Sequence, residues 1–313
     1  MLSAACACAS RAPIVRNRDA GMICAMRSPR LALLPLLLLA GCGGGAPAPV
    51  PPPVLTEAAV ARLAAHRDPR TWEDLDPSRP GQRLRDPRTG VVFVRVPAGE
   101  FTMGSDAAAD GTERPAHRVR ISRDWLLAET ELTAAQWRTF VRDFAGDPAV
   151  PVPEGDDLPM PISCQDALGF CARFGYRLPT EAEWERACRG GLSPEQEPWR
   201  TEEGMRAAAW FHRNADMQSH AVGQKAANPF GLRDMLGNLW EWCDDDFHPL
   251  VYQLHGAAAV DPRTPGTAGH RVLRGGSWFS TPPAMPHTRK SGAFAERTAF
   301  FGCRPACDAP ASR

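Results

Sequence analysis

The feature that most constrains the fold is a change in the sequence pattern at residue 91, where short apolar runs begin to alternate with turn residues. Residues 91–96 read Val-Val-Phe-Val-Arg-Val, a pattern typical of a strand. Residues 97–99, Pro-Ala-Gly, indicate a turn, and residues 100–104 predict a second short strand. Nothing that follows repeats at a fixed period, which excludes solenoids and propellers. We therefore expect a domain rich in short strands and long loops over residues 91–308.

Two amphipathic segments in this region predict helices. Residues 133–144 begin with Thr133, a good N-cap, and place four large apolar side chains on one face: Trp137, Phe140, Val141 and Phe144. Thr180 and Glu183 fit the capping-box pattern Ser/Thr-x-x-Glu, so a second helix is expected to follow Thr180. Trp184 in that helix is expected to face the core.

The first 41 residues contain the layout of an export signal. Arg27 and Arg30 precede an apolar run at residues 31–40. That run is too short to cross a hydrocarbon core of ~30 Å. The sequence Leu-Ala-Gly-Cys that ends at Cys42 is similar to the bacterial lipobox, which implies a lipid anchor on Cys42. Because this layout starts abruptly, Met22 or Met26 is the expected initiator.

The residues after Cys42 predict a tether and a linker. Residues 42–54 are rich in Gly, Pro and Ala, so they cannot bury much apolar surface. Residues 55–90 combine a short amphipathic helix with a polar linker, and residues 309–313 form a tail. We expect a lipid-anchored protein of the bacterial cell envelope, in an oxidising compartment. Gly43 favours the outer membrane, with the domain facing the periplasm.

Charge excludes one class of partner. The chain has 36 Lys and Arg against 36 Asp and Glu, a formal net charge of zero. A nucleic-acid-binding protein needs a basic face that neutralises phosphates, so we expect no nucleic acid partner. The histidines form no H-E-x-x-H motif, and the sequence contains neither a G-x-S-x-G elbow nor a P-loop.

Four segments, in this order, resemble the formylglycine-generating enzyme or sulfatase-modifying factor family. They are Val94–Ser105 (VRVPAGEFTMGS), Arg177–Glu185 (RLPTEAEWE), the pair Asn228–Leu232 (NPFGL) and Gly237–Trp242 (GNLWEW), and Arg274–Trp278 (RGGSW). The superfamily also includes ergothioneine-pathway sulfoxide synthases and pyoverdine-maturation proteins. The resemblance covers about residues 91–305. It implies an irregular α+β fold, a variant of the C-type-lectin fold, with short strands and few helices.

The resemblance also implies calcium. Hard cations such as Ca²⁺ bind carboxylate and carbonyl oxygens on bent loops. The family's calcium site matches Asp234 and Glu241 through their side chains, and Gly237 and Leu239 through their carbonyls. A second calcium site matches more poorly, at Asn214 and the carbonyl of Ala215. The alternative for the acidic turn at 234–241 is a solvated loop without a metal.

The family's known chemistry oxidises a substrate cysteine with O₂ and a copper ion held by two cysteines. A gapless reading of the resemblance from the Gly-Gly-Ser segment puts Ser280 and Met285 at those positions. A local gap would not restore the pair, because no cysteine lies between Cys243 and Cys303. Soft thiolates suit Cu(I), whereas a hydroxyl and a thioether do not replace them, so copper is not expected. Ser277 matches a serine beside the family's oxygen site.

Six cysteines follow Cys42, an even number that is consistent with disulfides in an exported protein. The resemblance favours a bridge from Cys171 to either Cys303 or Cys307, and it leaves Cys188 without its usual partner.

Two functional hypotheses follow. The first is a membrane-anchored module that makes no formylglycine and instead binds a peptide or protein partner or supports an envelope assembly. The second is an O₂-dependent oxidoreductase or a protein or siderophore maturation factor that uses a different site in the same fold. Copper and O₂ dependence discriminate between them. A sugar-binding lectin is a weaker alternative, for which nine Trp supply stacking surfaces.

Overall fold

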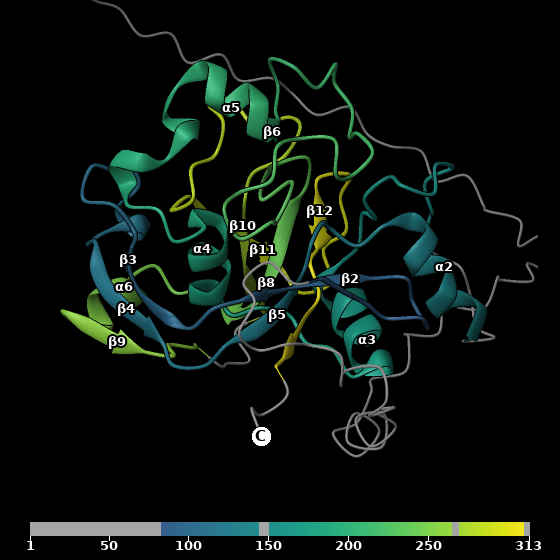
Figure 1. Cartoon of the computed structure of the whole chain (residues 1–313), viewed down its shortest axis with the longest axis horizontal. Helices are drawn as coiled ribbons and strands as arrows, with labels where there is room; N and C mark the ends of the chain where they lie inside the picture. The colour runs from purple at the N-terminus through teal and green to yellow at the C-terminus, as the bar shows by residue number, and fades with distance from the viewer. Residues whose placement is uncertain (1–82, 144–149, 265–268, 310–313) are drawn as a thin grey trace, which may run out of the picture. The chain divides into compact units, whose positions relative to one another are not determined.

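The computed structural model describes residues 83–143, 150–264 and 269–309, all within the unit Pro53–Arg313. The export signal, Cys42, the tether and the helix expected near residue 60 lie outside the described residues. Figure 1 shows short strands and helices joined by long loops. Among the described residues, no helix is long and apolar enough to span a membrane.

The strands form four small sheets in the described part of the chain. The first has the order β1 (Arg83–Arg85), β2 (Val92–Val96), β5 (Trp125–Ala128), β13 (Ala306–Asp308). The second has the order β11 (Arg289–Ala293), β10 (His270–Arg274), β8 (Trp240–Asp246), β12 (Phe301–Cys303). The third contains β3 (Gly99–Met103), β4 (His117–Ile121) and β9 (Ala258–Val260), and the fourth pairs β6 (Ala209–Trp210) with β7 (Leu236–Gly237).

The helices are short and sit beside these sheets (Figure 1). They are α2 (Ala134–Asp143), α3 (Cys164–Phe174), α4 (Glu181–Arg189), α5 (Glu202–Ala208) and α6 (Val251–Leu254), with 3-10 turns η2 (Gly111–Glu113), η3 (Pro194–Gln196) and η4 (Pro198–Arg200). Helix α4 contacts β10 and β8 on one side and β3 and β4 on the other, whereas α3 contacts α2 and β12.

Both helices expected from the sequence are confirmed with their caps. Thr133 Oγ1 accepts the Gln136 N–H at 3.3 Å and so caps α2. Thr180 and Glu183 form the predicted capping box of α4. Trp184 is fully buried, and its Nε1 donates to Glu241 at 2.7 Å. The strands β2 and β3 also fall where the sequence places them.

Two elements differ from the expectation. Helix α3 begins after Ser163, whose capping box uses Asp166 in place of the expected Glu or Gln, and its buried face contains Ala167 and Phe170. The sequence also indicated a linker up to residue 90, but Arg83–Arg85 pairs with β2 as an antiparallel edge strand. The segment Arg-Leu-Arg has one apolar residue, a half-buried leucine, which is too little apolar alternation to predict a strand. An edge strand of this kind forms by pairing with β2 and does not need a periodic apolar face.

Two apolar cores fill the domain, one around α4 and one around α3. The first core encloses a network of buried ion pairs that joins α4 to the second sheet. Arg274, with no exposed side chain, pairs with Glu185, and Arg289 donates to Glu181 at 2.7 and 2.8 Å. Burial alone would raise the pKa of Glu185, but Arg189 and Arg274 outweigh it and lower the pKa to about 2. The network therefore fixes the start of the loop that follows Arg274.

Candidate functional site

The Gly-Gly-Ser loop, residues 275–285, leaves β10 through two glycines in the left-handed region, with φ of 93° and 81°. A Cβ on Gly276 would lie 2.6 Å from the Ala284 Cβ, so the loop folds back tightly on itself. The Gly275 carbonyl accepts the Gly237 N–H at 2.9 Å, and Trp278 N donates to the Asn238 carbonyl at 2.8 Å. The loop therefore sits against the Gly-Asn turn that precedes β8.

Ser277 and Ser280 hold the loop closed. Ser280 Oγ accepts the Ser277 N–H at 2.9 Å, and the Ser280 N–H donates to the Ser277 carbonyl at the same distance. Ser277 is buried, and its Oγ accepts the Phe279 N–H at 3.3 Å. Met285 is half-buried against the core around α4. Its thioether and the Ser280 hydroxyl do not fit the soft, thiolate-bound copper site of formylglycine formation.

Aromatic side chains cover the outer side of this loop. Trp278 lies 5.6 Å from Phe279 and 4.9 Å from Phe300 between ring centroids, and Phe279 lies 5.7 Å from Phe300. Phe279 is 47% exposed, and His212 meets its ring edge-on at 5.9 Å. We call Trp278, Phe279 and Phe300 the aromatic platform. Such rings supply a large apolar contact surface, and the Trp278 indole N–H is used within the protein, where it donates to the Ala299 carbonyl at 3.3 Å.

Asp234, one of the expected calcium ligands, is buried, and one of its oxygens is unsatisfied. Its Oδ2 accepts the Gly223 N–H at 2.5 Å, whereas Oδ1 has no hydrogen-bond partner among the described residues. Glu131 is buried nearby, and its oxygens accept from Leu239 N and Asn238 Nδ2, both at 2.8 Å. Burial and the neighbouring Asp234 and Glu241 raise the pKa of Glu131 well above its usual range. A cation at this point would relieve that repulsion.

Glu241, the other expected side-chain ligand, is occupied by a guanidinium. Arg304 Nη2 and Nε donate to its carboxylate at 2.8 and 3.0 Å, and both side chains are almost completely buried. Within the described residues, no group of three or more His, Cys, Asp or Glu converges as a metal centre. Of the two expected side-chain ligands, Asp234 therefore offers calcium an unpartnered oxygen, with Glu131 close by, whereas Glu241 is already neutralised. The expected carbonyl ligands, Gly237 and Leu239, remain a prediction.

The expected second calcium site has its atoms engaged elsewhere. Asn214 Oδ1 accepts the Phe211 N–H, its Nδ2 donates to the Ala209 carbonyl, and the Ala215 carbonyl is 2.9 Å from His220 Nε2. His220 also stacks on Trp210, with ring centroids 3.9 Å apart. Asn214 Oδ1 and the Ala215 carbonyl thus already contact protein groups, and the second calcium site remains a prediction.

The cysteines of the domain are buried. Cys164, Cys171, Cys303 and Cys307 belong to the core around α3, and Cys188 and Cys243 to the core around α4. Cys171 and Cys303 are free thiols in the structure, and the expected bridge from Cys171 remains a prediction. Burial raises the pKa of Cys164 to about 12, which makes that thiol a poor nucleophile at neutral pH.

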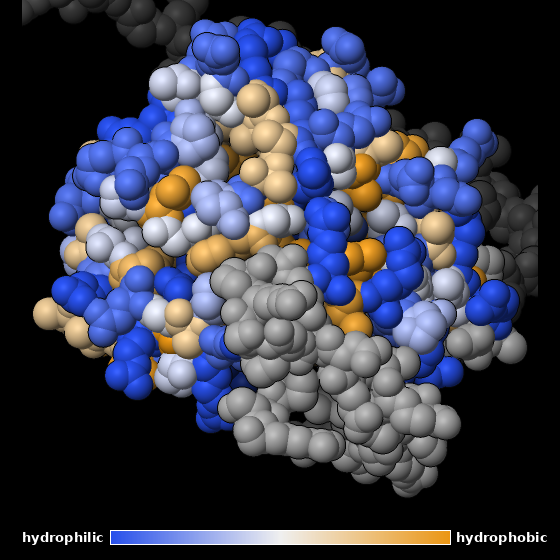
Figure 2. All heavy atoms as spheres, viewed as in Figure 1, coloured by the Kyte–Doolittle hydropathy of each residue, from blue (hydrophilic) through white to orange (hydrophobic). Residues whose placement is uncertain are grey.

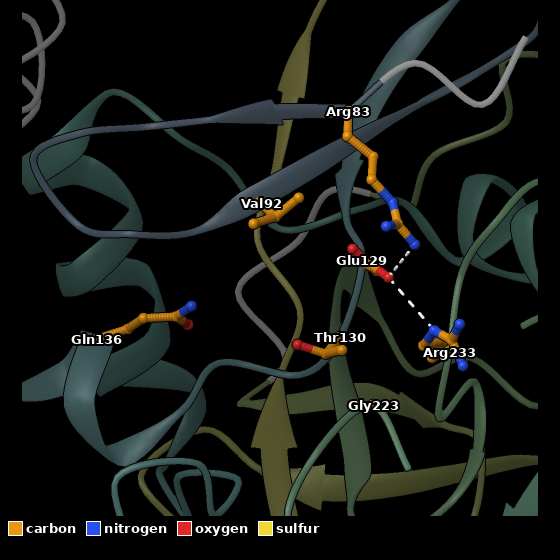
Figure 3. Close-up of a pocket in the computed structure, with 7 residues that line it drawn as sticks. All are labelled: Arg83, Val92, Glu129, Thr130, Gln136, Gly223 and Arg233. Atoms are coloured by element: carbon orange, nitrogen blue, oxygen red, sulfur yellow. Dashed lines mark hydrogen bonds and ion pairs between the residues drawn. The ribbon is translucent and has the colours of Figure 1, made fainter. Parts of the chain in front are cut away.

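A separate pocket of about 340 Å³ lies beside β1, β2 and α2 (Figure 3). Its lining is polar and comprises Arg83, Val92, Glu129, Thr130, Gln136, Gly223 and Arg233. It shares no residue with the Gly-Gly-Ser loop or the aromatic platform. Its link to the Asp234 cluster is the hydrogen bond from Gly223.

Sequence reasoning missed Glu131 and the aromatic platform. Glu131 lies between β5 and the cap of α2, at a position where a charged side chain usually faces water. Its burial, which the sequence does not show, is what marks it as part of the acidic cluster. Phe300 is far from Trp278 in sequence and joins the platform because β12 pairs with β8 in parallel. Trp278 was part of a recognised segment, but its neighbours were not predictable from that segment.

The chain matches known proteins across the described range. The model of the family described as "Sulfatase-modifying factor enzyme 1-like domain" matches residues 82–309. The formylglycine-generating enzyme of Streptomyces coelicolor is 33% identical over 265 residues, covering 64% of this chain and 83% of that protein. Inactive C-alpha-formylglycine-generating enzyme 2 of Mus musculus is 30% identical over 248 residues, covering 61% and 75%. The structure of PvdO from Pseudomonas aeruginosa has the same fold, with a TM-score of 0.63 and 23% identity over 74% of this chain and 99% of that one.

Proposed function

Because this chain belongs to the sulfatase-modifying factor family and has its α+β fold, we propose that it is a binding member of that family. Its ligand is a peptide or protein segment, and it makes no formylglycine. The observation that carries the proposal is the Gly-Gly-Ser loop, where Ser280 and Met285 stand in place of the two copper-binding cysteines. The aromatic platform, two of whose rings lie on the same loop, supplies a contact surface for a partner side chain. The mouse relative that is named inactive is a precedent within the family.

Anchoring belongs to the same proposal. The lipobox-like sequence that ends at Cys42 supports a lipid anchor, and Gly43 supports the outer membrane with the domain in the periplasm. Cys42→Ser is expected to release the protein from the membrane fraction while leaving peptide binding intact. Retention of Cys42→Ser in the membrane fraction would contradict the anchor.

Calcium is the cofactor that we propose. Support comes from the unsatisfied Asp234 Oδ1 and the buried Glu131, whose negative charges a cation would compensate. Ca²⁺ is expected to raise the thermal midpoint of the wild type by mass action. Asp234→Asn is expected to lose that shift, while Glu203→Gln, an exposed control on α5, keeps it. An equal shift in both variants would contradict calcium binding at Asp234.

Peptide selection tests the binding function. The purified protein is panned against a random peptide library, and the affinities of enriched peptides are measured for the wild type and for Phe279→Ala. We expect at least a ~10-fold loss, since removing a central aromatic contact in an interface costs about 1–2 kcal/mol or more. Leu254→Ala is the matched control, because Leu254 is 73% exposed on α6 and outside the platform.

Two outcomes of this experiment count against the proposal. Enriched peptides that bind Phe279→Ala as tightly as the wild type would remove the platform from the binding site. A library without enriched peptides, together with peptide-dependent O₂ uptake, would favour the alternative of an oxidoreductase with a non-standard site.

A further inference from the structure

The pocket beside β1 and α2 presents charged groups that the described residues satisfy only in part. Arg83 Nη2 and Arg233 Nε lie 2.5 and 3.3 Å from the same oxygen, Glu129 Oε1. Arg233 Nη1 donates to the Lys225 carbonyl at 2.6 Å. Among the described residues this leaves Arg83 Nε and Nη1, Arg233 Nη2 and Glu129 Oε2 without a protein partner.

A neutral donor faces the same pocket from α2. Gln136 Oε1 accepts the Thr133 N–H at 3.0 Å as part of the helix cap, so the amide orientation is fixed. Its Nε2 has no partner among the described residues, and Figure 3 shows the amide directed toward the pocket. The pocket thus offers hydrogen-bond donors from three elements and one free carboxylate oxygen.

We propose that this pocket binds a small zwitterion of the amino-acid class. The ligand carboxylate lies on Arg83 and Arg233, and its ammonium group lies on Glu129 Oε2, while Gln136 lines the opposite side of the pocket (Figure 3). The pocket holds two guanidinium groups and one carboxylate, so its net positive charge repels a simple cation. A simple anion is attracted by the guanidiniums but is repelled by the Glu129 carboxylate. A molecule with both charges on neighbouring atoms satisfies both sides. The site is separate from the aromatic platform, so this inference does not rest on the proposed partner-binding function.

The size and rigidity of the pocket agree with such a ligand. Its volume of about 340 Å³ is at the lower end of the range of ligand pockets, which suits an amino acid or a dipeptide better than a larger molecule. Gly223, which lines the pocket, donates its N–H to Asp234 Oδ2, and Arg233 N donates to the Glu129 carbonyl at 2.9 Å. The backbone at Gly223 and Arg233 is therefore positioned before binding, which lowers the ordering cost there, whereas the Arg83 side chain is 52% exposed and is ordered by its ion pair with Glu129.

The test is calorimetric titration of the full chain with L-alanine, acetate, methylammonium and inorganic phosphate, used as separate probes. We expect saturable binding of alanine, weaker binding of acetate and phosphate, and no binding of methylammonium. Arg233→Gln and Glu129→Gln are each expected to weaken alanine binding at least ~10-fold, because a hydrogen bond to a charged group contributes about 1.5–3 kcal/mol.

Arg118→Gln is the matched control. It removes one arginine of an exposed ion pair, with Glu100, on the β3–β4 hairpin and leaves the pocket intact. Amide chemical shifts of Thr130 and Gly223 in the wild type give a second readout that does not depend on the folding of any variant. Both are expected to move with alanine.

Three results would overturn the proposal. The first is no saturable binding of alanine and no shift at Thr130 and Gly223. The second is equal affinity for alanine, acetate and phosphate, which would define a plain anion site. The third is alanine binding that Arg233→Gln and Glu129→Gln leave unchanged.

Discussion

Arg304 and Glu241 form a bidentate ion pair in the interior of the domain, with Arg304 Nη2 2.8 Å from Glu241 Oε1. Arg304 also donates to the carbonyls of Ala128 and Arg233, each at 2.9 Å. One side chain therefore joins the end of β5, strand β8 and the segment before Asp234. The pair organises the buried acidic cluster whether or not a cation is added to it.

Removing one partner of this pair is expected to be costly. Arg304→Met leaves Glu241 buried without its counter-ion, which should lower the free energy of unfolding by about 3–5 kcal/mol. The double variant Arg304→Met, Glu241→Leu should recover much of that loss, because neither charge remains. Urea unfolding of the three proteins measures both effects. A single variant as stable as the wild type would mean that Glu241 has another partner.

Stability is expected to depend on pH through two groups with opposite shifts. Burial raises the pKa of Glu113 to about 7, so its contribution to stability is present below its ordinary value of 4.5 and is lost as the pH rises to 7. Glu185, lowered to about 2, contributes above pH 4.5 and loses its contribution as the pH falls to 2. Glu113→Gln should flatten the loss between pH 4.5 and 7, because glutamine mimics the protonated acid. Thermal midpoints across this range measure it, and an unchanged profile would contradict the assignment.

Two histidines define a second pH-dependent contact. His117 Nδ1 lies 3.0 Å from the Pro115 carbonyl, so it donates, and His117 Nε2 must then accept from His255 Nδ1 at 3.0 Å. Burial and His117 lower the pKa of His255, so stability falls as the pH drops below 6.5. The charges that face His255 from other elements are Glu181 on α4, which favours its protonated form, and Arg289 on β11, which opposes it.

Nitrogen-resolved NMR of the imidazoles tests this contact. At pH 8 both rings should carry the proton on Nδ1, whereas the exposed His212 should show the usual mixture of tautomers. On acidification, the backbone amides of β9, which pairs with β4, should lose protection first. A His117 ring protonated on Nε2 at pH 8 would contradict the hydrogen-bond assignment.

Local sequence patterns predicted the parts of the fold that local rules govern. The Thr133 cap of α2, the capping box of α4, the β2 and β3 strands and the burial of Trp184 follow from local spacing, since each depends on residues a few positions apart. Helix α3 was missed because its box uses aspartate, although Ser163 and the spacing of Ala167, Phe170 and Phe174 carried the same information.

The site depends on contacts between distant segments, which spacing does not reveal. Asp234 was predicted as a ligand, but the pairing of Glu241 with Arg304 joins two residues that are 63 positions apart in the sequence. Glu131 joins the acidic cluster across more than 100 positions, through Leu239 and Asn238. A single sequence shows such residues as ordinary charges, because their burial is a property of the assembled fold.

Oxygen consumption tests the central claim most directly. The purified protein is loaded with Cu(I) and given a thiol reductant and a peptide with the sulfatase-type pattern Cys-x-Pro-x-Arg. The account predicts no O₂ uptake beyond that of copper and reductant alone, because Ser280 and Met285 replace the thiolate pair. Peptide-dependent O₂ uptake with conversion of the peptide cysteine to formylglycine would contradict it.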